Sequence, residues 1–296
     1  MTSGKGARTA WRSRQMARHF ATAVRRSSAA ARRTVVSGLS AAGTLQRATL
    51  ELLFPATCAS CRDELSPDAS AMTGLPLCEA CLDEMELFHG PTCRRCGAPV
   101  PRVAVSPDRG KGSAAKESGC YRCRGRKLWF DETIAAGLYG DRLRELLLRM
   151  KTSTGDSLSL AIGQLVWQQC GERLSAANAH VVVPIPSHWR RRLAHRTNSA
   201  ALLAEVLAGR LRLPLAEGLL RRRRATRRQS DLTPPQRWEN LRQAFSVRAG
   251  YHLRKAHVLL VDDILTTGAT CSEAARTLRK AGAARVTAVV VARALG

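Results

Sequence analysis

Eight of the ten cysteines in this 296-residue chain form four Cys-x-x-Cys pairs, and no other feature constrains the fold as strongly. The pairs are separated by 16, 11 and 23 residues; they are Cys58/Cys61, Cys78/Cys81, Cys93/Cys96 and Cys120/Cys123. A Cys-x-x-Cys turn points both sulfurs at one centre, and two such turns complete a tetrahedral Zn²⁺ site. We therefore expect two structural zinc sites, each already filled by four thiolates.

The order of the pairs along the chain leaves more than one zinc topology open. The simplest pairing is sequential, with the first two pairs on one zinc and the last two on the other, although an interleaved pairing is also compatible with the spacing. A disulfide framework is disfavoured because no secretory signal is visible. The remaining cysteines, Cys170 and Cys271, are expected to pack as small apolar side chains.

The charge of the chain is strongly positive, with 48 Lys and Arg against 23 Asp and Glu, a net +25. Such a surface attracts phosphates, either in nucleic acid or in small polyanions. Four arginines beside the cysteine pairs either contact nucleic acid or form a solvated rim: Arg94, Arg95, Arg122 and Arg124. No apolar run approaches the roughly 18–20 residues of a membrane-spanning helix, so we do not expect a membrane protein.

Composition divides the chain into three parts. Residues 1–44 are basic and are expected to be a disordered arm, with a partner-induced helix or an organellar transit peptide as alternatives. Residues 45–129 are expected to form a double zinc ribbon, with a short helix over 45–54 and a mobile loop rich in Pro, Gly and Ser between Cys96 and Cys120. Residues 130–296 form the third part.

This third part alternates between apolar strands and helices, which predicts an α/β fold with a parallel sheet covered by helices on both faces. We expect strands at Thr133–Tyr139, His180–Val183, Val258–Val261 and Val286–Ala292. We expect helices at Asp141–Lys151, Leu158–Leu174, Ser199–Leu211 and Ser272–Ala281, with Asp141 able to cap the first.

The most informative string runs from Val258 to Thr270, VLLVDDILTTGAT. A buried strand ends there in two carboxylates, Asp262 and Asp263, and a Thr/Gly loop then opens a helix. Ligands of open α/β sheets bind at this end of the strands, and a helix N-terminus attracts phosphate. The carboxylates suit sugar hydroxyls, so the expected ligand is a sugar that carries a phosphate.

This string resembles the 5-phosphoribosyl-1-pyrophosphate (PRPP) motif of type I phosphoribosyltransferases. The resemblance implies that Asp262 and Asp263 hold the ribose hydroxyls. It also implies a cradle for the 5′-phosphate, formed by Thr266, Thr267, Gly268, Ala269 and Thr270.

Further segments resemble the ComF family, which joins a cysteine zinc ribbon to a phosphoribosyltransferase domain and is linked to DNA uptake and to the use of DNA as a nutrient. They are Leu147–Lys151, Val183–Pro186 with Trp189–Arg192, and Arg224–Leu232, and with the cysteine pairs they extend the resemblance over residues 45–296. Many members carry Arg-Gly-Phe-Asn-Gln where this chain has His195-Arg-Thr-Asn-Ser199.

By this resemblance, Pro184 and Arg190 are further PRPP ligands near the pyrophosphate loop. Six arginines crowd Arg221–Arg228, and Arg223 and Arg224 are expected to be catalytic by neutralising the departing pyrophosphate. A solvated loop or a nucleic-acid contact is the alternative reading of this run.

The function expected from these features is Mg²⁺-dependent phosphoribosyl transfer from PRPP to a nucleobase-type acceptor, in cytoplasmic nucleotide salvage linked to DNA uptake. No general base is identifiable. One alternative is a non-catalytic DNA-binding accessory module that meets single-stranded DNA and DNA-uptake proteins. The other is an interaction protein that has lost activity.

Overall fold

The computed structural model describes residues 56–65, 74–101, 119–152, 154–187, 198–224, 226–227 and 232–295. Several expectations fall outside these ranges. They are the basic arm 1–44, the helix over 45–54, most of the loop between Cys96 and Cys120, and the residues Arg190, Arg196 and Thr197.

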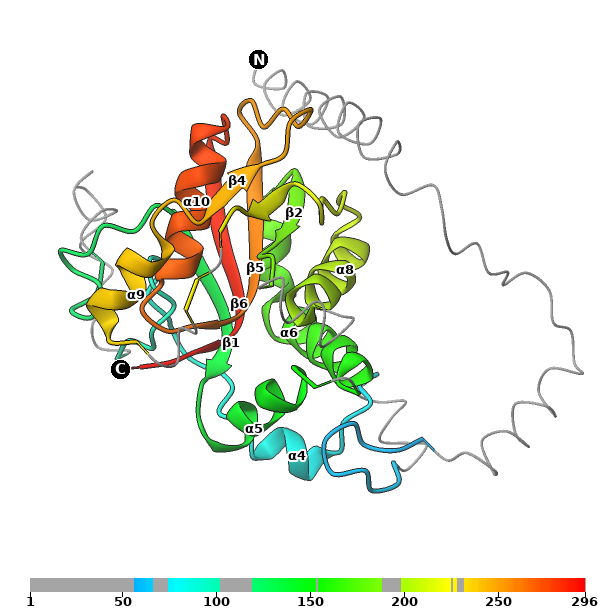
Figure 1. Ribbon diagram of the computed structural model, residues 1–296. Coiled ribbons are helices and arrows are strands. Elements are labelled where there is room, and N and C mark those ends of the chain that lie inside the picture. Colours follow the sequence, from blue (N-terminus) through cyan, green and yellow to red (C-terminus); the bar gives the residue numbers. More distant parts are fainter. Residues whose placement is uncertain are drawn as a thin grey trace, which may run out of the picture.

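The core of the protein is a four-stranded sheet in which every neighbouring pair of strands is parallel. The strands are β1 (Glu132–Leu138), β2 (Val181–Pro184), β5 (His257–Leu265) and β6 (Arg285–Arg293), in the spatial order β1-β6-β5-β2. All four carboxyl ends lie at one edge of the sheet (Figure 1). The predicted parallel α/β sheet is thus confirmed.

Alternation along the strands explains why helices cover both faces, since successive strand residues point to opposite sides. On β5, Leu259 and Val261 enter one core and Val258 and Leu260 the other. The first core also contains α6 (Asp156–Ala176) and α8 (Ser199–Leu211), and the second contains α10 (Ala269–Lys280). Figure 1 shows α6 and α8 on one side of the sheet and α9 and α10 on the other.

All eight helices and strands predicted within residues 130–296 are present, with differences at their ends. β5 continues to Leu265, so the two carboxylates lie within the strand and not beyond it. α10 begins at Ala269, three residues before the predicted start, because the glycine turn leads directly into the helix. Asp141 is the first residue of α5 (Asp141–Arg149) and makes no capping hydrogen bond; Gly140 is the N-cap.

A small antiparallel pair of strands was not predicted. β3 (Leu220–Arg222) pairs with β4 (Phe245–Val247), and between them lies α9 (Pro234–Leu241), which begins with a Thr233–Gln236 capping box. The guanidinium of Arg222 lies 5.3 Å from the ring centroid of Phe245. The start of the arginine run is therefore a strand and not a loop.

The chain between the two groups of cysteines lies along the free edge of β1. Leu138 N–H donates to Glu86 O (2.8 Å) and Phe88 N–H donates to Ala136 O (2.9 Å), with an antiparallel bridge between Leu87 and Gly137. A Cβ on Gly137 would lie 2.6 Å from Glu86 O, so only glycine permits this approach. The ribbon region and the sheet are one continuous structure at this edge.

Within the described residues, no helix has the length and apolarity needed to cross a bilayer.

Candidate functional site

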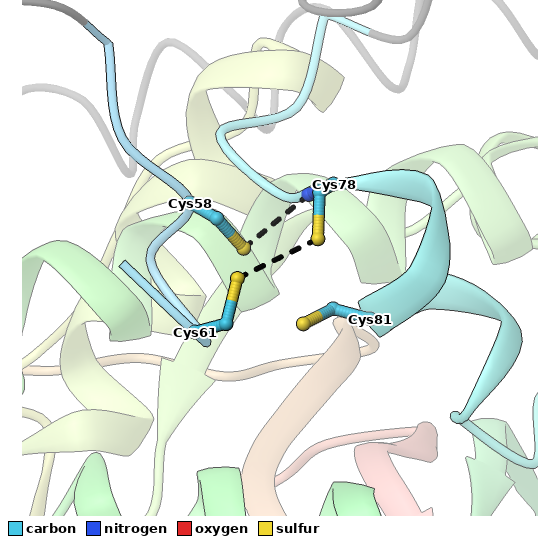
Figure 2. Close-up of side chains that lie close together, drawn as sticks. All are labelled: Cys58, Cys61, Cys78 and Cys81. Atoms are coloured by element: carbon cyan, nitrogen blue, oxygen red, sulfur yellow. Dashed lines mark hydrogen bonds between the residues drawn. The ribbon is translucent and has the colours of Figure 1, made fainter. Parts of the chain in front are cut away.

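The eight paired cysteines form two tetrads. The sulfurs of each tetrad lie within 4.8 Å of one another; tetrad 1 is Cys58, Cys61, Cys78 and Cys81, and tetrad 2 is Cys93, Cys96, Cys120 and Cys123. Figure 2 shows the four side chains of tetrad 1 converging on a common centre. The grouping is the sequential one, and all ten cysteines are free thiols. Four sulfurs around one centre are the donor set of structural zinc, so the residues fit two zinc ions.

Local contacts lower the pKa of two thiols in tetrad 1, Cys58 and Cys81, and of one thiol in tetrad 2, Cys93. Burial raises the pKa of Cys58, but backbone N–H groups outweigh it and bring the pKa down to about 6. A hydrogen bond from Cys96 is the main cause that lowers the pKa of Cys93 to about 4. Burial and contacts with neighbouring thiols raise the pKa of Cys61, Cys78, Cys96 and Cys123. Since the thiolate is the form that binds metal, these four thiols have to lose their protons when the metal binds.

Helix α5 is hydrogen-bonded to tetrad 1 and to the loop that carries it. Arg142 donates to the Cys81 sulfur (3.0 Å), and Arg149 donates to the carbonyls of Ser60 (2.5 Å) and Ala59 (3.3 Å). A hydrogen bond to a ligating sulfur orients the ligand. The helix that follows β1 is therefore attached to the first cysteine loop.

The two carboxylates of the PRPP-like string lie near the carboxyl end of β5, where both side chains are partly exposed. Each aspartate accepts a hydrogen bond from the backbone N–H of the residue that follows it. Asp263 N–H donates to Asp262 Oδ1 (3.0 Å), and Ile264 N–H donates to Asp263 Oδ1 (2.8 Å). Burial, and then the neighbouring charge of Asp263, raise the pKa of Asp262 well above its ordinary value. The charged form of Asp262 is therefore costly in the ligand-free protein.

A lysine that sequence reasoning did not place at the site pairs with the second carboxylate. Lys151 Nζ lies 2.6 Å from Asp263 Oδ2. It follows α5, so the helix attached to tetrad 1 also carries the partner of Asp263. The segment Leu147–Lys151 carries part of the resemblance to the ComF family, but nothing in the sequence connects it with β5.

The turn after β5 opens directly onto the N-terminus of α10. Gly268 is the N-cap with φ +81°, a conformation that favours glycine, and Thr267 Oγ1 accepts from Ala269 N–H (3.3 Å). Ala269 and Thr270 form the first helical turn. The helix N-terminus therefore lies only a few residues from the two carboxylates, as a sugar phosphate requires.

The segment after tetrad 2 packs on this turn. A Cβ on Gly268 would lie 3.4 Å from Leu128 and 3.5 Å from Phe130, and Trp129 N–H donates to the Ser272 hydroxyl (3.0 Å). The segment that follows tetrad 2 therefore reaches the N-terminal end of α10. Cys271, in the first turn of α10, is buried, and its sulfur lies 4.0 Å from Asp262 Oδ2. Burial raises the pKa of Cys271 well above its ordinary value, which fits an inert packed thiol.

The other predicted site residues occupy different places. Pro184 is the last residue of β2, paired with Val261 immediately before the carboxylates. Arg223 is exposed, and its N–H donates to Ala244 O (2.8 Å). The exposed Arg224 donates to the carbonyls at Asn240 and Arg242, both at 3.0 Å. The pyrophosphate role of Pro184, Arg223 and Arg224 remains a prediction.

Comparisons with known proteins agree with this architecture. The family models of the double zinc ribbon domain and the phosphoribosyl transferase domain match residues 49–124 and 197–295. The DNA utilization protein YhgH of Salmonella typhimurium is 30% identical over 71% of this chain and 93% of its own length. Competence protein F of Haemophilus influenzae is 26% identical over 81% and 98%, and the Escherichia coli YhgH protein is 27% identical over 71% and 93%.

The chain belongs to the ComF family. In this ComF-family chain both tetrads are connected to the end of β5 and the turn that follows it. Tetrad 1 is connected through α5 and Lys151, and tetrad 2 through Leu128–Phe130.

We expect the purified protein to contain two zinc ions per chain, because each tetrad brings four sulfurs within 4.8 Å of one another. Cys81→Ser and Cys93→Ser should each lower the content to about one, measured by inductively coupled plasma mass spectrometry with protein quantified in parallel. Cys170→Ser, which replaces a buried cysteine outside both tetrads, is the matched control. A well-folded, metal-free preparation would contradict the two sites.

The pKa of Asp262 gives a second expectation. The pKa of this carboxyl is higher in the folded protein than in the unfolded chain. Its contribution to stability is therefore fully present at a pH below the pKa of the unfolded chain, and it is lost as the pH rises through the pKa of the folded protein. Asp262→Asn should therefore raise the stability of the ligand-free protein at pH 8 by about 1–2 kcal/mol, and the gain should shrink towards pH 5. Thermal unfolding measures it, with Glu205→Gln on the exposed face of α8 as control. A loss of stability at pH 8 would mean that the carboxylate is fully compensated.

Proposed function

We propose that this chain binds PRPP with Mg²⁺ and transfers its phosphoribosyl group to a nucleobase-type acceptor, in cytoplasmic nucleotide salvage linked to DNA uptake or utilisation. The relatives named for competence and DNA utilization support that biological setting. The observation that carries the proposal is the closeness of two partly buried carboxylates on β5 to the glycine-capped N-terminus of α10.

The two halves of this site suit the two halves of the ligand. Asp262 and Asp263 would accept hydrogen bonds from the ribose 2′- and 3′-hydroxyls, and Thr266–Thr270 with the helix N-terminus would bind the 5′-phosphate. Gly268 lets the backbone approach the phosphate closely. Holding both ends of the sugar fixes its anomeric carbon for attack.

The proposed reaction breaks the bond from C1′ to pyrophosphate and forms a bond from C1′ to a ring nitrogen of the acceptor. The bonding electrons leave with pyrophosphate, and the acceptor nitrogen releases its proton to solvent or to the leaving group. Arg223 and Arg224 are the residues proposed to neutralise pyrophosphate, which would require Arg224 to leave the carbonyls it contacts.

Carboxylate oxygens at the end of β5 are ligands that Mg²⁺ accepts, and Mg²⁺ commonly joins one or two carboxylates to substrate phosphates. The residues present, Asp262 and Asp263, therefore fit the ion. When bound, Mg²⁺ would supply charge stabilisation for the departing pyrophosphate.

Calorimetric titration with PRPP and Mg²⁺ tests binding. We expect Asp262→Asn/Asp263→Asn to weaken affinity about 100-fold or more, since two hydrogen bonds to charged groups are lost. Glu172→Gln/Glu205→Gln makes the same charge change on exposed positions of α6 and α8 and should bind as the wild type does. If the zinc-loaded wild type binds no PRPP, the proposal fails; if it binds, pyrophosphate release with a panel of nucleobases identifies the acceptor.

A second candidate function, binding of single-stranded DNA, is favoured by the outer surface of the second ribbon. Tyr121 is 72% exposed and Trp129 37% exposed, the two most prominent exposed aromatics among the described residues. Arg122 lies 5.1 Å from the Tyr121 ring and Lys127 lies 5.0 Å from the Trp129 ring. Exposed rings beside cations are the features that bind unpaired bases and phosphates.

Fluorescence anisotropy with a labelled oligothymidylate tests this second candidate. We expect affinity to fall steeply with salt, and Tyr121→Ala/Trp129→Ala to lose about tenfold or more at constant zinc content. Leu148→Ala/Leu160→Ala removes apolar side chains exposed elsewhere, at 47% and 39%, and should have no effect. Equal affinity of the aromatic variant and the wild type would exclude the ribbon as the DNA surface.

A further inference from the structure

Arg293, at the end of β6, joins tetrad 2 to residues 265–271, which contain the turn between β5 and α10 and which we call the phosphate loop. Its side chain is buried, and Nε donates to the carbonyl of Cys96 (2.8 Å), a residue of tetrad 2. Its Nη1 donates to the carbonyls of Leu265 (2.8 Å) and Thr266 (2.6 Å), and also to that of Ala294. One guanidinium thus holds a zinc-ligand loop on one side and the start of the phosphate loop on the other.

The partners of this guanidinium indicate a positioning role. Arg293 forms no ion pair with a carboxylate within the part of the chain that the structure describes, and it donates to backbone carbonyls. A buried guanidinium is costly unless its donors are satisfied, so these carbonyls have to keep their places around it. A displaced Cys96 loop would remove the acceptor of Nε and leave only the Nη1 contacts to the carbonyls of Leu265, Thr266 and Ala294.

An independent contact joins the same two parts. Leu128 and Phe130, which follow the last cysteine of tetrad 2, lie against Gly268, and Trp129 N–H donates to the hydroxyl of Ser272 in α10. Tetrad 1, in contrast, contacts α5 through Arg142 and Arg149. The phosphate loop is therefore attached to tetrad 2 by both routes.

We propose that Arg293 is a positioning residue through which metal binding at tetrad 2 orders the phosphate loop, residues 265–271. A bound metal would fix the backbone around Cys96. Arg293, which is hydrogen-bonded to the Cys96 carbonyl, would in turn fix the positions of the Leu265 and Thr266 carbonyls. Its consequence for PRPP affinity rests on the proposed function, whereas the ordering of the loop does not.

Hydrogen–deuterium exchange of the ligand-free protein tests the ordering directly. We expect Arg293→Met to raise exchange across residues 265–271, and Cys123→Ser, which removes one sulfur of tetrad 2, to raise it in the same residues. Arg285→Met is the matched control. It removes an arginine from the opposite end of β6, where Arg285 pairs with Glu132 at 2.9 Å, and should leave these residues protected. Cys61→Ser in tetrad 1 should also spare them.

The same variants are then titrated with PRPP and Mg²⁺. Arg293→Met should weaken binding about tenfold or more, and Arg293→Lys, which keeps the charge but not the forked donors, should be intermediate in exchange and affinity. If Arg293→Met does not fold, Arg293→Lys and Cys123→Ser carry the test. Unchanged exchange at 265–271 in these variants overturns the coupling. Increased exchange with no PRPP binding by the wild type upholds it and rejects the proposed function alone.

Discussion

Strand β5 is the element on which the rest of the structure depends, because it pairs on both sides within the parallel sheet. β2 and β6 flank it, and its alternating apolar residues enter the cores on both faces. Burying this strand on both faces fixes its register firmly, since a shift of one residue would exchange every side chain between the cores. The two carboxylates that follow the apolar run are thereby held at a fixed depth at the edge of the sheet.

At this end of β5, partly buried polar side chains reduce the free energy of unfolding of the ligand-free protein. The charge on Asp262 is disfavoured by burial and by Asp263, and Lys151 compensates Asp263 from outside the strand. Such conflicts between stability and local chemistry are typical of ligand sites. The surrounding packing of α6, α8 and α10 against the sheet supplies the stability that allows them.

Much of this architecture could be predicted from the sequence, because its signals are local. Cysteine spacing predicted two tetrads, short apolar runs between helical segments predicted the four strands of the sheet, and VLLVDDILTTGAT predicted a strand, a turn and a helix. β3 was missed because three residues, two of them arginines, carry no strand pattern. Lys151 and Arg293 were missed because their contacts join distant parts of the chain; Arg293 and Cys96 are 197 residues apart. Only the fold brings such pairs together.

The approach of Glu86 to Gly137 has a consequence for how this protein could be shortened or recombined. An open sheet edge is a template for pairing with other chains, and here residues 86–88 occupy the outer edge of β1. The segment that does so also connects the two tetrads, so a part of the ribbon region covers the edge of β1 that other chains could otherwise pair with. A transferase domain excised from about residue 130 would lose that shield. The zinc ribbon region and the phosphoribosyltransferase domain therefore cannot be exchanged independently of each other. Any chimera must retain the short segment between the tetrads.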